Sequence, residues 1–566
     1  MRPTHFALIA VLTAAAAHAQ TPSIDLPANL PVLPAAQQAK MDRDLMEIDV
    51  PHLQALYAKH TYTVEQVTRW YMGRIARYNG VYRAVQTVNT ADALATAKAE
   101  DGAARSAVHG TLWGVPVVIK ANTAVKDLPD TDGWQGFALP GHEFVAPRDA
   151  TVVAKLRAAG AVILGITNMP DFAASDTNRS TAFGRTGNAY DVRFSPGGSS
   201  GGTVTAVTSN EAMLGTGTDT ANSIRMPAGT SSVVGMLPTR GLVSIAGIAP
   251  LDWLLDNTGP IARNVTDAAI ALGVMAGPDP MDFKTADAAA KAQAPTYTQY
   301  LKPDALKGKR FGVPAFILKG DTGFGVSTAA RPTNAMRPET RVLLMKAIDA
   351  VRAAGAEVVI DDTLLPDTFA QTVRKINTSA YRRDGTDQWL GAFGPAQYHS
   401  AAEYEKAVGS PLPATITGIA NPNAPAQTNR PPTPQVALKA DPDAEANYFA
   451  PQRAALAEYT AALDRLHLDG LIYPSAQMPP PDETMPQNGQ LSSGPHSNTG
   501  WVNRIGVPAV VVPAGFYDTG LPFGLEISAR AWRDGDLLGW AYAYEQATKL
   551  RRPPVLVESG LLPNAR

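Results

Sequence analysis

Two apolar segments separated by a helical one constrain the fold of this 566-residue chain most strongly. Val115–Lys120 has the composition of a buried strand that ends in lysine, Thr151–Ala159 has helical spacing, and residues 160–165 form a second apolar run. A strand, a helix and a second strand in this order form a parallel pair, because the helix returns the chain to the edge where the first strand began. The pattern recurs where the helical residues 341–354 precede the apolar run 356–360. We therefore predict an α/β protein whose sheet contains parallel strands.

Other elements follow from capping and periodicity. Thr63 and Gln66 form a capping box, and apolar residues at spacings of three and four predict a helix from there to Asn79-Gly80. We predict further strands at 310–313, 471–473, 510–512 and 525–529, and a closing helix at 534–548. Residues 280–305 and 408–445 are rich in alanine and proline without a clear period, which predicts surface loops that are either plain linkers or lids over a site.

The N-terminus has the pattern of an export signal. Arg2 and His5 precede an apolar stretch from Phe6 to Ala17, and Ala17-His-Ala19 matches a small-residue cleavage site. We predict a signal peptide over 1–19, a periplasmic or secreted mature protein, an N-terminal extension over 20–44, one large domain over 45–552 and a tail over 553–566. A buried N-terminal helix is the alternative. No later run approaches the roughly twenty apolar residues of a membrane span.

Composition excludes several function classes. The formal charge is −2 and no block of like charges occurs, so the chain lacks the basic footprint of a nucleic-acid partner. It has no cysteine, and therefore no disulfide and no thiolate metal ligand. Its nine histidines are scattered, and neither a His-Glu-x-x-His run nor a Gly-x-Gly-x-x-Gly loop after a strand is present. We expect no metal and no cofactor.

Two loops of small residues supply candidate nucleophiles. Ser195–Gly202 and Gly217–Arg225 are rich in serine and glycine, and both follow the strand that ends at Lys120. A serine hydroxyl needs a base, and a lysine amine serves as one only when burial keeps it neutral. That requires a pKa shift of about three units, or roughly 4 kcal/mol, which desolvation supplies if no carboxylate is close. Each feature alone also fits a structural role, since glycine–serine turns and strand-end lysines are common.

Together these features resemble the amidase signature family of serine hydrolases. Lys120 precedes two serines, Ser199 and Ser223, that lie 24 residues apart, and further segments along the chain are similar to the family. These segments are Thr167–Ala173, Phe183–Asn188, Asn257–Arg263, Gly506–Gly515 and Gly520–Glu526. The resemblance implies a single α/β domain with a mixed central sheet wrapped by helices, and it covers residues from about 45 to 550 except the two loop regions.

The resemblance also implies the roles of site residues and the activity. Ser223 would be the nucleophile, Ser199 would relay its proton and Lys120 would be the base; family members adopt a cis peptide around the relay serine. The backbone N–H groups of Thr220, Ala221, Asn222 and Ser223 would hold the oxyanion, with Ser200, Asp219 and Arg225 in support. The implied activity is hydrolysis of a linear carboxylic amide through an acyl-enzyme, without a cofactor.

Two departures from the family pattern affect this hypothesis. Relatives place two glycines before the nucleophile where this chain has Ala221-Asn222, and alanine in a left-handed conformation would cost on the order of 1 kcal/mol. Asn222 could instead add a side-chain donor to the oxyanion hole. Relatives also carry an acid after the lysine, where this chain has Ala121, and its absence would favour a neutral amine.

Two alternative functions remain open. One is a periplasmic binding protein that has lost turnover through the Ala221-Asn222 change. The other takes Gly197–Gly201 as the nucleophile elbow of an α/β-hydrolase esterase, with Ser199 as nucleophile and a later histidine, His399, His467 or His496. That elbow requires a buried strand immediately before it.

The substrate is predicted only as a class. We expect a small carboxamide, an anilide or a peptide C-terminal amide, and the near-neutral charge and export signal argue against a tRNA partner. The pocket walls are predicted from residues 123–133 and 173–178, Trp134, the Trp253 region and the loop near Trp501. The sequence carries no signal for an oligomeric state.

Overall fold

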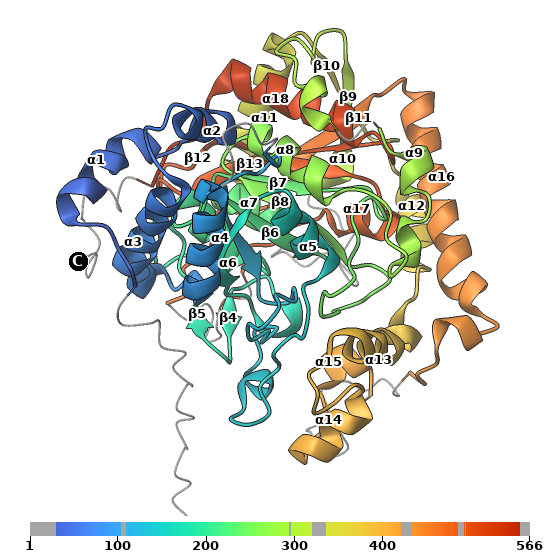
Figure 1. Cartoon of the computed structure of the whole chain (residues 1–566). Helices are drawn as coiled ribbons and strands as arrows, with labels where there is room; N and C mark the ends of the chain where they lie inside the picture. Colours follow the sequence, from blue (N-terminus) through green and yellow to red (C-terminus); the bar gives the residue numbers. More distant parts are fainter. Residues whose placement is uncertain are drawn as a thin grey trace, which may run out of the picture.

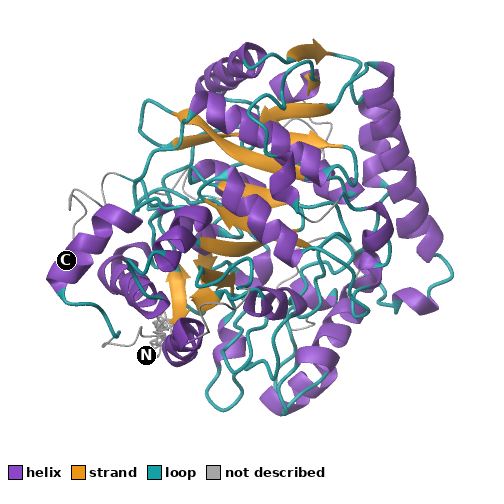
Figure 2. Ribbon diagram, turned by 45° about the horizontal axis from the view of Figure 1, so that its top comes forward, coloured by secondary structure: helices purple, strands orange, loops and turns teal. Residues whose placement is uncertain are grey.

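The computed structural model describes residues 30–102, 109–293, 296–319, 335–419, 433–484, 492 and 494–554. The predicted signal peptide and most of the predicted tail lie outside these residues. Within them, a mixed 11-stranded sheet runs through the molecule, with helices around it (Figures 1 and 2). The predicted single α/β domain with a mixed central sheet is confirmed.

The strands of the main sheet follow one another along the whole chain. They are β1 (Val85–Val88), β2 (Pro116–Lys120), β3 (Val162–Thr167), β6 (Leu214–Asp219), β7 (Val234–Leu237), β8 (Asn257–Ala262), β9 (Arg310–Pro314), β10 (Glu357–Asp361), β11 (Gly470–Pro474), β12 (Ala509–Phe516) and β13 (Pro522–Ala529). A separate small hairpin consists of β4 (Arg179–Ser180) and β5 (Gly184–Arg185).

The spatial order of the main sheet is β1-β3-β2-β6-β8-β7-β12-β13-β11-β9-β10. The two predicted strand–helix–strand units are parallel pairs, β2 with β3 and β9 with β10. β2 also pairs in parallel with β6, whereas β6, β8, β7, β12, β13 and β11 pair antiparallel. The antiparallel pair β12 and β13 near the C-terminus therefore joins the two halves of the sheet.

Helices cover the sheet and build the outer parts of the molecule. They are α1 (Ala35–Leu45), α2 (Val50–Ala58), α3 (Val64–Tyr82), α4 (Thr90–Gly102), α5 (Thr151–Ala158), α6 (Gly201–Thr208), α7 (Arg225–Thr230), α8 (Val265–Met275), α9 (Ala288–Lys291), α10 (Ala315–Lys319), α11 (Pro338–Ala353), α12 (Asp367–Arg374), α13 (Arg382–Phe393), α14 (Ala401–Val408), α15 (Ala414–Thr417), α16 (Ala450–Arg465), α17 (Gly500–Ile505) and α18 (Asp534–Thr548). In Figure 1, α13, α14 and α15 form a group that projects from the body of the molecule.

The first long helix shows where local rules held and where they did not. Thr63 caps α3 with the predicted reciprocal bonds to Gln66. The predicted stop at Asn79-Gly80 is wrong, because α3 continues to Tyr82. The Asn79 side chain explains the difference: it accepts from the N–H groups of Ala84 and Val85, both at 2.8 Å, and so shapes the turn after the helix.

The predicted N-terminal extension and loops contain ordered elements. α1 begins inside the predicted extension 20–44 and ends one residue beyond it, at Leu45. Its Met41 and Leu45 side chains are buried in the main core. The 280–305 segment contains two short 3-10 helices, Phe283–Thr285 and Tyr297–Tyr300, besides α9. The 408–445 segment contains α15, and its residues 420–432 lie outside the described part.

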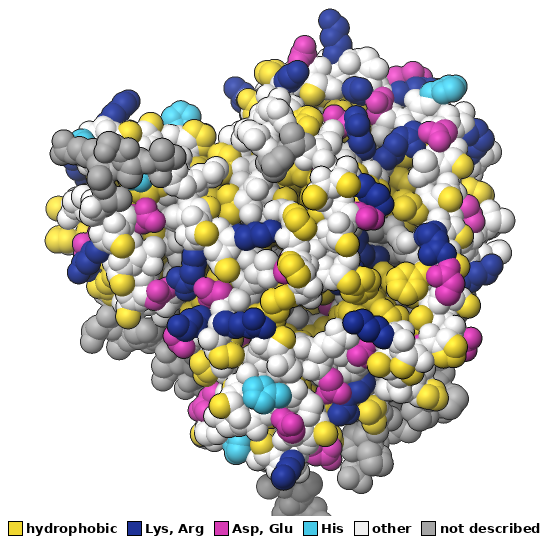
Figure 3. Space-filling model, turned by 45° about the vertical axis from the view of Figure 1, so that its right-hand side comes forward, with side chains coloured by type: hydrophobic (Ala, Val, Ile, Leu, Met, Phe, Trp, Pro, Cys, Tyr) yellow, Lys and Arg dark blue, Asp and Glu magenta, His cyan; other side chains and the backbone are white. Residues whose placement is uncertain are grey.

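Basic and acidic side chains are interspersed on the face drawn in Figure 3. This pattern agrees with the near-neutral formal charge of −2. Among the described residues, no helix combines the length and the apolar character that crossing a bilayer requires.

Candidate active site

The parallel pairing of β2 and β6 brings the lysine and both serine loops to one edge of the sheet. Val117 pairs with Leu214 and Val118 with Gly215, so the two strands end side by side at Lys120 and Asp219. Groups that follow parallel strands collect at their carboxyl ends, which is where open α/β sheets place ligands. The Ser199 loop leads into α6, and the Ser223 loop joins β6 to α7.

Lys120 is fully buried and surrounded by neutral oxygen atoms. Its Nζ lies 2.7 Å from Ser199 Oγ, 3.0 Å from Ser200 Oγ and 2.8 Å from Thr218 Oγ1. Within the described residues it forms no ion pair. A neutral amine both donates to and accepts from hydroxyl groups, so this setting accommodates the deprotonated form of the lysine.

Burial lowers the pKa of Lys120 to about 7, although the carboxyl groups of Asp132, Asp219 and Asp256 act in the opposite direction. The sequence analysis made the absence of a nearby carboxylate the condition for this shift, and three carboxyl groups are close enough to raise the pKa of the amine. Desolvation outweighs them because none of the three forms an ion pair with the amine. The amine is thus partly neutral at physiological pH, as a general base requires.

The carboxyl group with the largest of these effects, that of Asp132, was missed by the sequence reasoning. The Asp132 N–H donates to the carbonyl of Ala121 at 2.7 Å, which places Asp132 beside the residue that follows Lys120. Asp132 is buried, and neither of its carboxyl oxygens has a hydrogen-bond partner within the described residues. Burial and the neighbouring Asp130 raise the pKa of Asp132 well above its ordinary value, whereas the Lys120 amine acts in the opposite direction.

Ser199 is presented on a closely packed turn. The peptide bond between Gly198 and Ser199 is cis, as the resemblance implied. A side chain at Gly198 would lie 2.4 Å from the Thr177 carbonyl oxygen, so only glycine fits there. Ser200 Oγ, which also accepts from the Lys120 amine, donates to the Thr218 carbonyl at 3.4 Å.

The Ser223 loop exposes a row of unused backbone donors. In the described part of the chain, the N–H groups of Thr220, Ala221, Asn222 and Ser223 donate no hydrogen bond, whereas the Ile224 N–H donates to Asp219 Oδ2 at 3.1 Å. Several free N–H groups converging on one point are what an oxyanion hole requires. The Ser223 carbonyl accepts from the Ser200 N–H at 3.3 Å, which holds the two loops together. No hydrogen bond joins the Ser223 and Ser199 hydroxyl groups within the described residues.

The buried side chain of Arg225 holds the Ser223 loop in place. It is fully buried, and its Nε donates to Asp219 Oδ2 at 3.1 Å while its Nη1 donates to Glu526 Oε1 at 2.5 Å. The guanidinium also binds the carbonyl of Ala221 and both oxygen atoms of Thr499. Asp219 and Arg225 thus lie together under the loop, where the sequence analysis expected supporting residues.

The Ala221-Asn222 departure introduces no left-handed backbone. Neither residue has a positive φ, so the expected strain at Ala221 does not occur. The Asn222 side chain donates to Ser497 Oγ at 3.2 Å and also bonds to Asp176. It is therefore engaged with the cavity wall and does not supplement the backbone donors of the loop.

Comparison with known proteins decides the family. The sequence profile of the family described as Amidase matches residues 66–538. The chain belongs to the amidase family. The resemblance to amidase signature enzymes is thereby confirmed.

Several members of the amidase family align with nearly the whole chain. The A subunit of the glutamyl-tRNA(Gln) amidotransferase of Caldanaerobacter subterraneus is 31% identical over 525 residues, which cover 90% of this chain and 98% of that protein. Its counterpart in a Cyanothece species is 32% identical over 501 residues, covering 86% and 95%. The structure of native peptide amidase from Stenotrophomonas maltophilia superposes with a TM-score of 0.71 at 30% identity, covering 90% and 98% of the two chains.

The cavity of this amidase beside Ser223 has a volume of about 570 Å³. Its walls include the free N–H loop 220–223, residues 173–176, Leu251, Asp252 and Leu255. The predicted contributions from residues 173–178 and from the Trp253 region are thus present, although Trp253 itself lines a neighbouring cavity of about 690 Å³. Thr415 also lines the site cavity, so the 408–445 segment contributes to its wall.

Other predicted wall residues lie elsewhere. None of residues 123–133 lines the site cavity. Trp134 packs against Phe137 and Phe172 with ring centroids 5.2 Å away in each case. Trp501 itself is fully buried against Tyr459 and other rings, but Arg504 on the same helix lines the cavity, so the predicted contribution from the region near Trp501 is present. Neither Trp134 nor Trp501 lines the site cavity.

Two arginines of the site cavity were not predicted. Arg382 opens α13, and Arg504 lies on α17 just before the Gly506–Gly515 motif. Arg504 belongs to the region near Trp501, which the sequence analysis assigned to the pocket wall without naming Arg504 itself. The sequence offered no signal for Arg382, which is 159 residues from Ser223 in sequence and is brought near only by the fold.

The nucleophile elbow lacks the strand that it requires. Residues 191–198 form no strand, only a single bridge between Phe194 and Asp482. His399 and His467 are exposed on the surface. Ser199 instead bonds to the Lys120 amine, so the geometry does not favour the esterase alternative.

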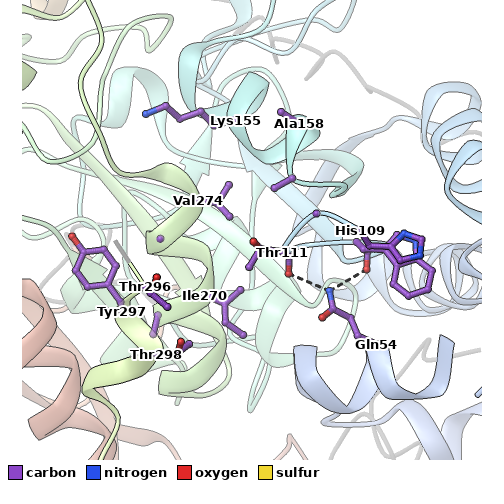
Figure 4. Close-up of a pocket in the computed structure, with 15 residues that line it drawn as sticks. Gln54, His109, Thr111, Lys155, Ala158, Ile270, Val274, Thr296, Tyr297 and Thr298 are labelled. Atoms are coloured by element: carbon purple, nitrogen blue, oxygen red, sulfur yellow. Dashed lines mark hydrogen bonds between the residues drawn. The ribbon is translucent and has the colours of Figure 1, made fainter. Parts of the chain in front are cut away.

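A larger cavity of about 900 Å³ lies between α2, α5 and α8 and contains none of the site residues (Figure 4). Two of its polar side chains bind backbone carbonyls: Gln54 Nε2 donates to Thr111 at 3.1 Å, and Lys155 Nζ donates to Ala276 at 3.0 Å. Among the described residues, no group of three histidine, aspartate or glutamate side chains could hold a metal ion.

Proposed function

We propose that the protein hydrolyses linear carboxylic amides through a seryl acyl-enzyme, with Ser223 as nucleophile, Ser199 as relay and Lys120 as base. One observation carries the proposal: a buried lysine amine, with its pKa lowered to about 7, binds Ser199 Oγ at 2.7 Å at the base of the loop that carries Ser223. Membership of the amidase family supports the same chemistry.

The proposed reaction uses these groups in the following order. Ser223 Oγ gives its proton to Ser199 Oγ, whose own proton passes to the Lys120 amine, and the Ser223 oxygen bonds to the amide carbon. The carbonyl electrons move onto the oxygen, which the free N–H groups of 220–223 stabilise. The C–N bond then breaks as the proton returns through Ser199 to the leaving nitrogen. Water, activated by the same relay, cleaves the acyl ester and releases the carboxylic acid.

Covalent labelling and amide turnover test this proposal together. Treatment with a fluorophosphonate should add one label, and peptide mapping should place it on Ser223. A panel of aliphatic amides, anilides and peptide C-terminal amides should release ammonia or amine. The peptide amidase similarity supports including the last class. A chain that takes no label and turns over no amide would instead be the catalytically inactive binding protein.

The rate should rise with pH as Lys120 loses its proton. Its pKa is lowered to about 7, so the ammonium form predominates below that pH and the basic amine above it. We expect kcat/KM to increase about tenfold per unit below pH 7 and to level off above about pH 8. The pH dependence of fluorophosphonate labelling should show the same midpoint. A rate that rises through pH 10 would mean that the lysine has an ordinary pKa.

We also propose that the chain is exported after cleavage behind Ala19. The support is the pattern of residues 1–19, which lie outside the described structure. N-terminal sequencing of protein from the periplasmic fraction or the medium should begin at Gln20. Recovery of an uncleaved chain from the cytoplasm alone would contradict export.

A further inference from the structure

The cavity beside Ser223 contains two cations that the reaction above does not use. Arg382 and Arg504 come from α13 and α17, far from each other in sequence, and both line the cavity with the nucleophile loop. Neither forms an ion pair within the described residues. An arginine that faces a cavity without a carboxylate partner is unusual, because burial of an unpaired charge is unfavourable.

Most of the donors on both guanidinium groups are unused. Arg504 Nη1 donates to the Ile376 carbonyl at 3.2 Å, and Arg382 Nη1 donates to the Thr415 carbonyl at 2.5 Å. Within the described residues these are the hydrogen bonds that the two side chains donate, whereas each guanidinium carries five N–H donors. Both side chains are only partly exposed, so solvent does not fully replace the missing partners.

The charges around the cavity leave this end positive. Burial lowers the pKa of Arg504, and the nearby Arg240 and Arg382 act in the same direction, whereas Asp252 opposes them. Asp252 already accepts a hydrogen bond from Thr378 Oγ1. The other acid of the cavity, Asp176, bonds to Asn222 beside the nucleophile, and burial raises its pKa to about 7. One carboxylate thus faces two guanidinium groups.

We propose that the cleft selects amides that carry a carboxylate group, which binds to Arg504 and Arg382 while the amide carbon lies at Ser223. This inference rests on the proposed amide hydrolysis and names the substrate class. Planar guanidinium groups pair with carboxylates through two parallel hydrogen bonds, which gives both strength and orientation. A cavity of about 570 Å³ has the size typical of small-molecule sites.

Matched substrates isolate the charge. Succinic and glutaric acid monoamides are compared with 4-methylpentanamide and 5-methylhexanamide, in which an isopropyl group replaces the carboxylate at the same distance from the amide. We expect at least about a tenfold higher kcat/KM for the better anionic amide than for its isostere. Equal values for both members of each pair would overturn the inference.

Arginine variants assign the preference to this part of the cavity. Arg504→Gln and Arg382→Gln should each lower kcat/KM for the anionic amide about 10- to 100-fold and leave the isostere within about twofold. Arg504→Glu should favour the cationic 5-aminopentanamide over glutaric acid monoamide. Arg383→Gln is the matched control, because Arg383 is on the same helix but pairs with Asp387 at 2.7 Å and does not line the cavity. Equal losses for both amides would contradict the assignment.

A binding measurement separates this inference from the proposed function. In the Ser223→Ala background, calorimetry should detect glutaric acid monoamide but not 5-methylhexanamide at the same concentration, and Arg504→Gln should abolish that binding. This readout does not require turnover. Selective binding without Ser223 labelling in the wild-type chain would refute the hydrolase but support the anion site. Labelling of Ser223 together with equal binding of the two amides would support the hydrolase and refute the anion site.

Discussion

Replacing Ser223 by alanine will abolish amide hydrolysis, with kcat reduced by at least about 10³-fold. The same loss is expected for Ser199→Ala and Lys120→Ala, because the proton path fails when any of the three groups is missing. The losses in kcat are not additive when residues act as one unit. The triple variant should therefore have about the same kcat as the least active single variant. Steady-state ammonia release and burst kinetics on the amide panel measure these effects.

Controls distinguish loss of chemistry from loss of fold. Ser209→Ala removes another fully buried serine hydroxyl, one that donates to the Thr205 carbonyl at 2.7 Å away from the site, and should retain activity. Ser200→Ala removes one acceptor from the Lys120 amine and should cost far less than Ser199→Ala. If Ser223→Ala stays active while Ser199→Ala takes no label, Ser199 is the nucleophile and the proposed triad is wrong.

Replacing Arg225 by methionine will destabilise the fold by about 3–5 kcal/mol at pH 8. The variant leaves the Asp219 and Glu526 carboxylates, both fully buried, without their shared cation. Removing one member of a buried ion pair costs more than the pair contributes, because the remaining charge is desolvated and unpaired. Urea unfolding monitored by circular dichroism gives the free energy of unfolding.

The loss will depend on pH with a definite sign. Burial raises the pKa of Glu526 to about 7 even though Arg225 lowers it, so without Arg225 the pKa is higher still. A folded-state pKa above the unfolded value of about 4.5 means that stability is greatest at low pH and falls as pH rises through the folded pKa. The penalty of Arg225→Met should therefore be smaller at pH 5.5 than at pH 8.

A double variant and a surface control test the cause. Arg225→Met/Glu526→Gln removes one of the two stranded carboxylates and should recover part of the lost stability. Arg453→Met breaks an ion pair between two well-exposed side chains, Arg453 and Glu445. This variant should lower the free energy of unfolding much less. If the double variant is no more stable than Arg225→Met, lost packing rather than stranded charge explains the destabilisation.

Local patterns predicted the half of the site that is close together in sequence. The strand ending at Lys120, the turn before α6 and the loop before α7 carry their own signals in proline, glycine and serine. Because β2 and β6 are parallel neighbours, the lysine and the Ser223 loop at their carboxyl ends lie at the same edge of the sheet. The capping box at Thr63 was likewise a local rule that held.

Features that depend on distant contacts were not predictable. Arg382 and Arg504 reach the cavity from helices that the fold, not the sequence spacing, brings to Ser223. Asp132 gains its position beside Ala121 from one backbone hydrogen bond that no motif indicates. α3 ends later than predicted because the Asn79 side chain accepts hydrogen bonds from the N–H groups five and six residues later. These bonds override the Asn-Gly signal.

The long sequence separation within the Arg225 cluster has a consequence for how the protein is made. Arg225 binds Glu526, 301 residues later, and Thr499, 274 residues later. That glutamate lies on β13, and β12 and β13 enter the sheet between β7 and β11 rather than at its edge. While the ribosome is still translating, the loop with Ser223 has left the tunnel without the cluster that shapes it. A nascent chain that stops before residue 526 therefore lacks the glutamate that pairs with Arg225, and the Ser223 loop gains its full support only when synthesis is nearly finished.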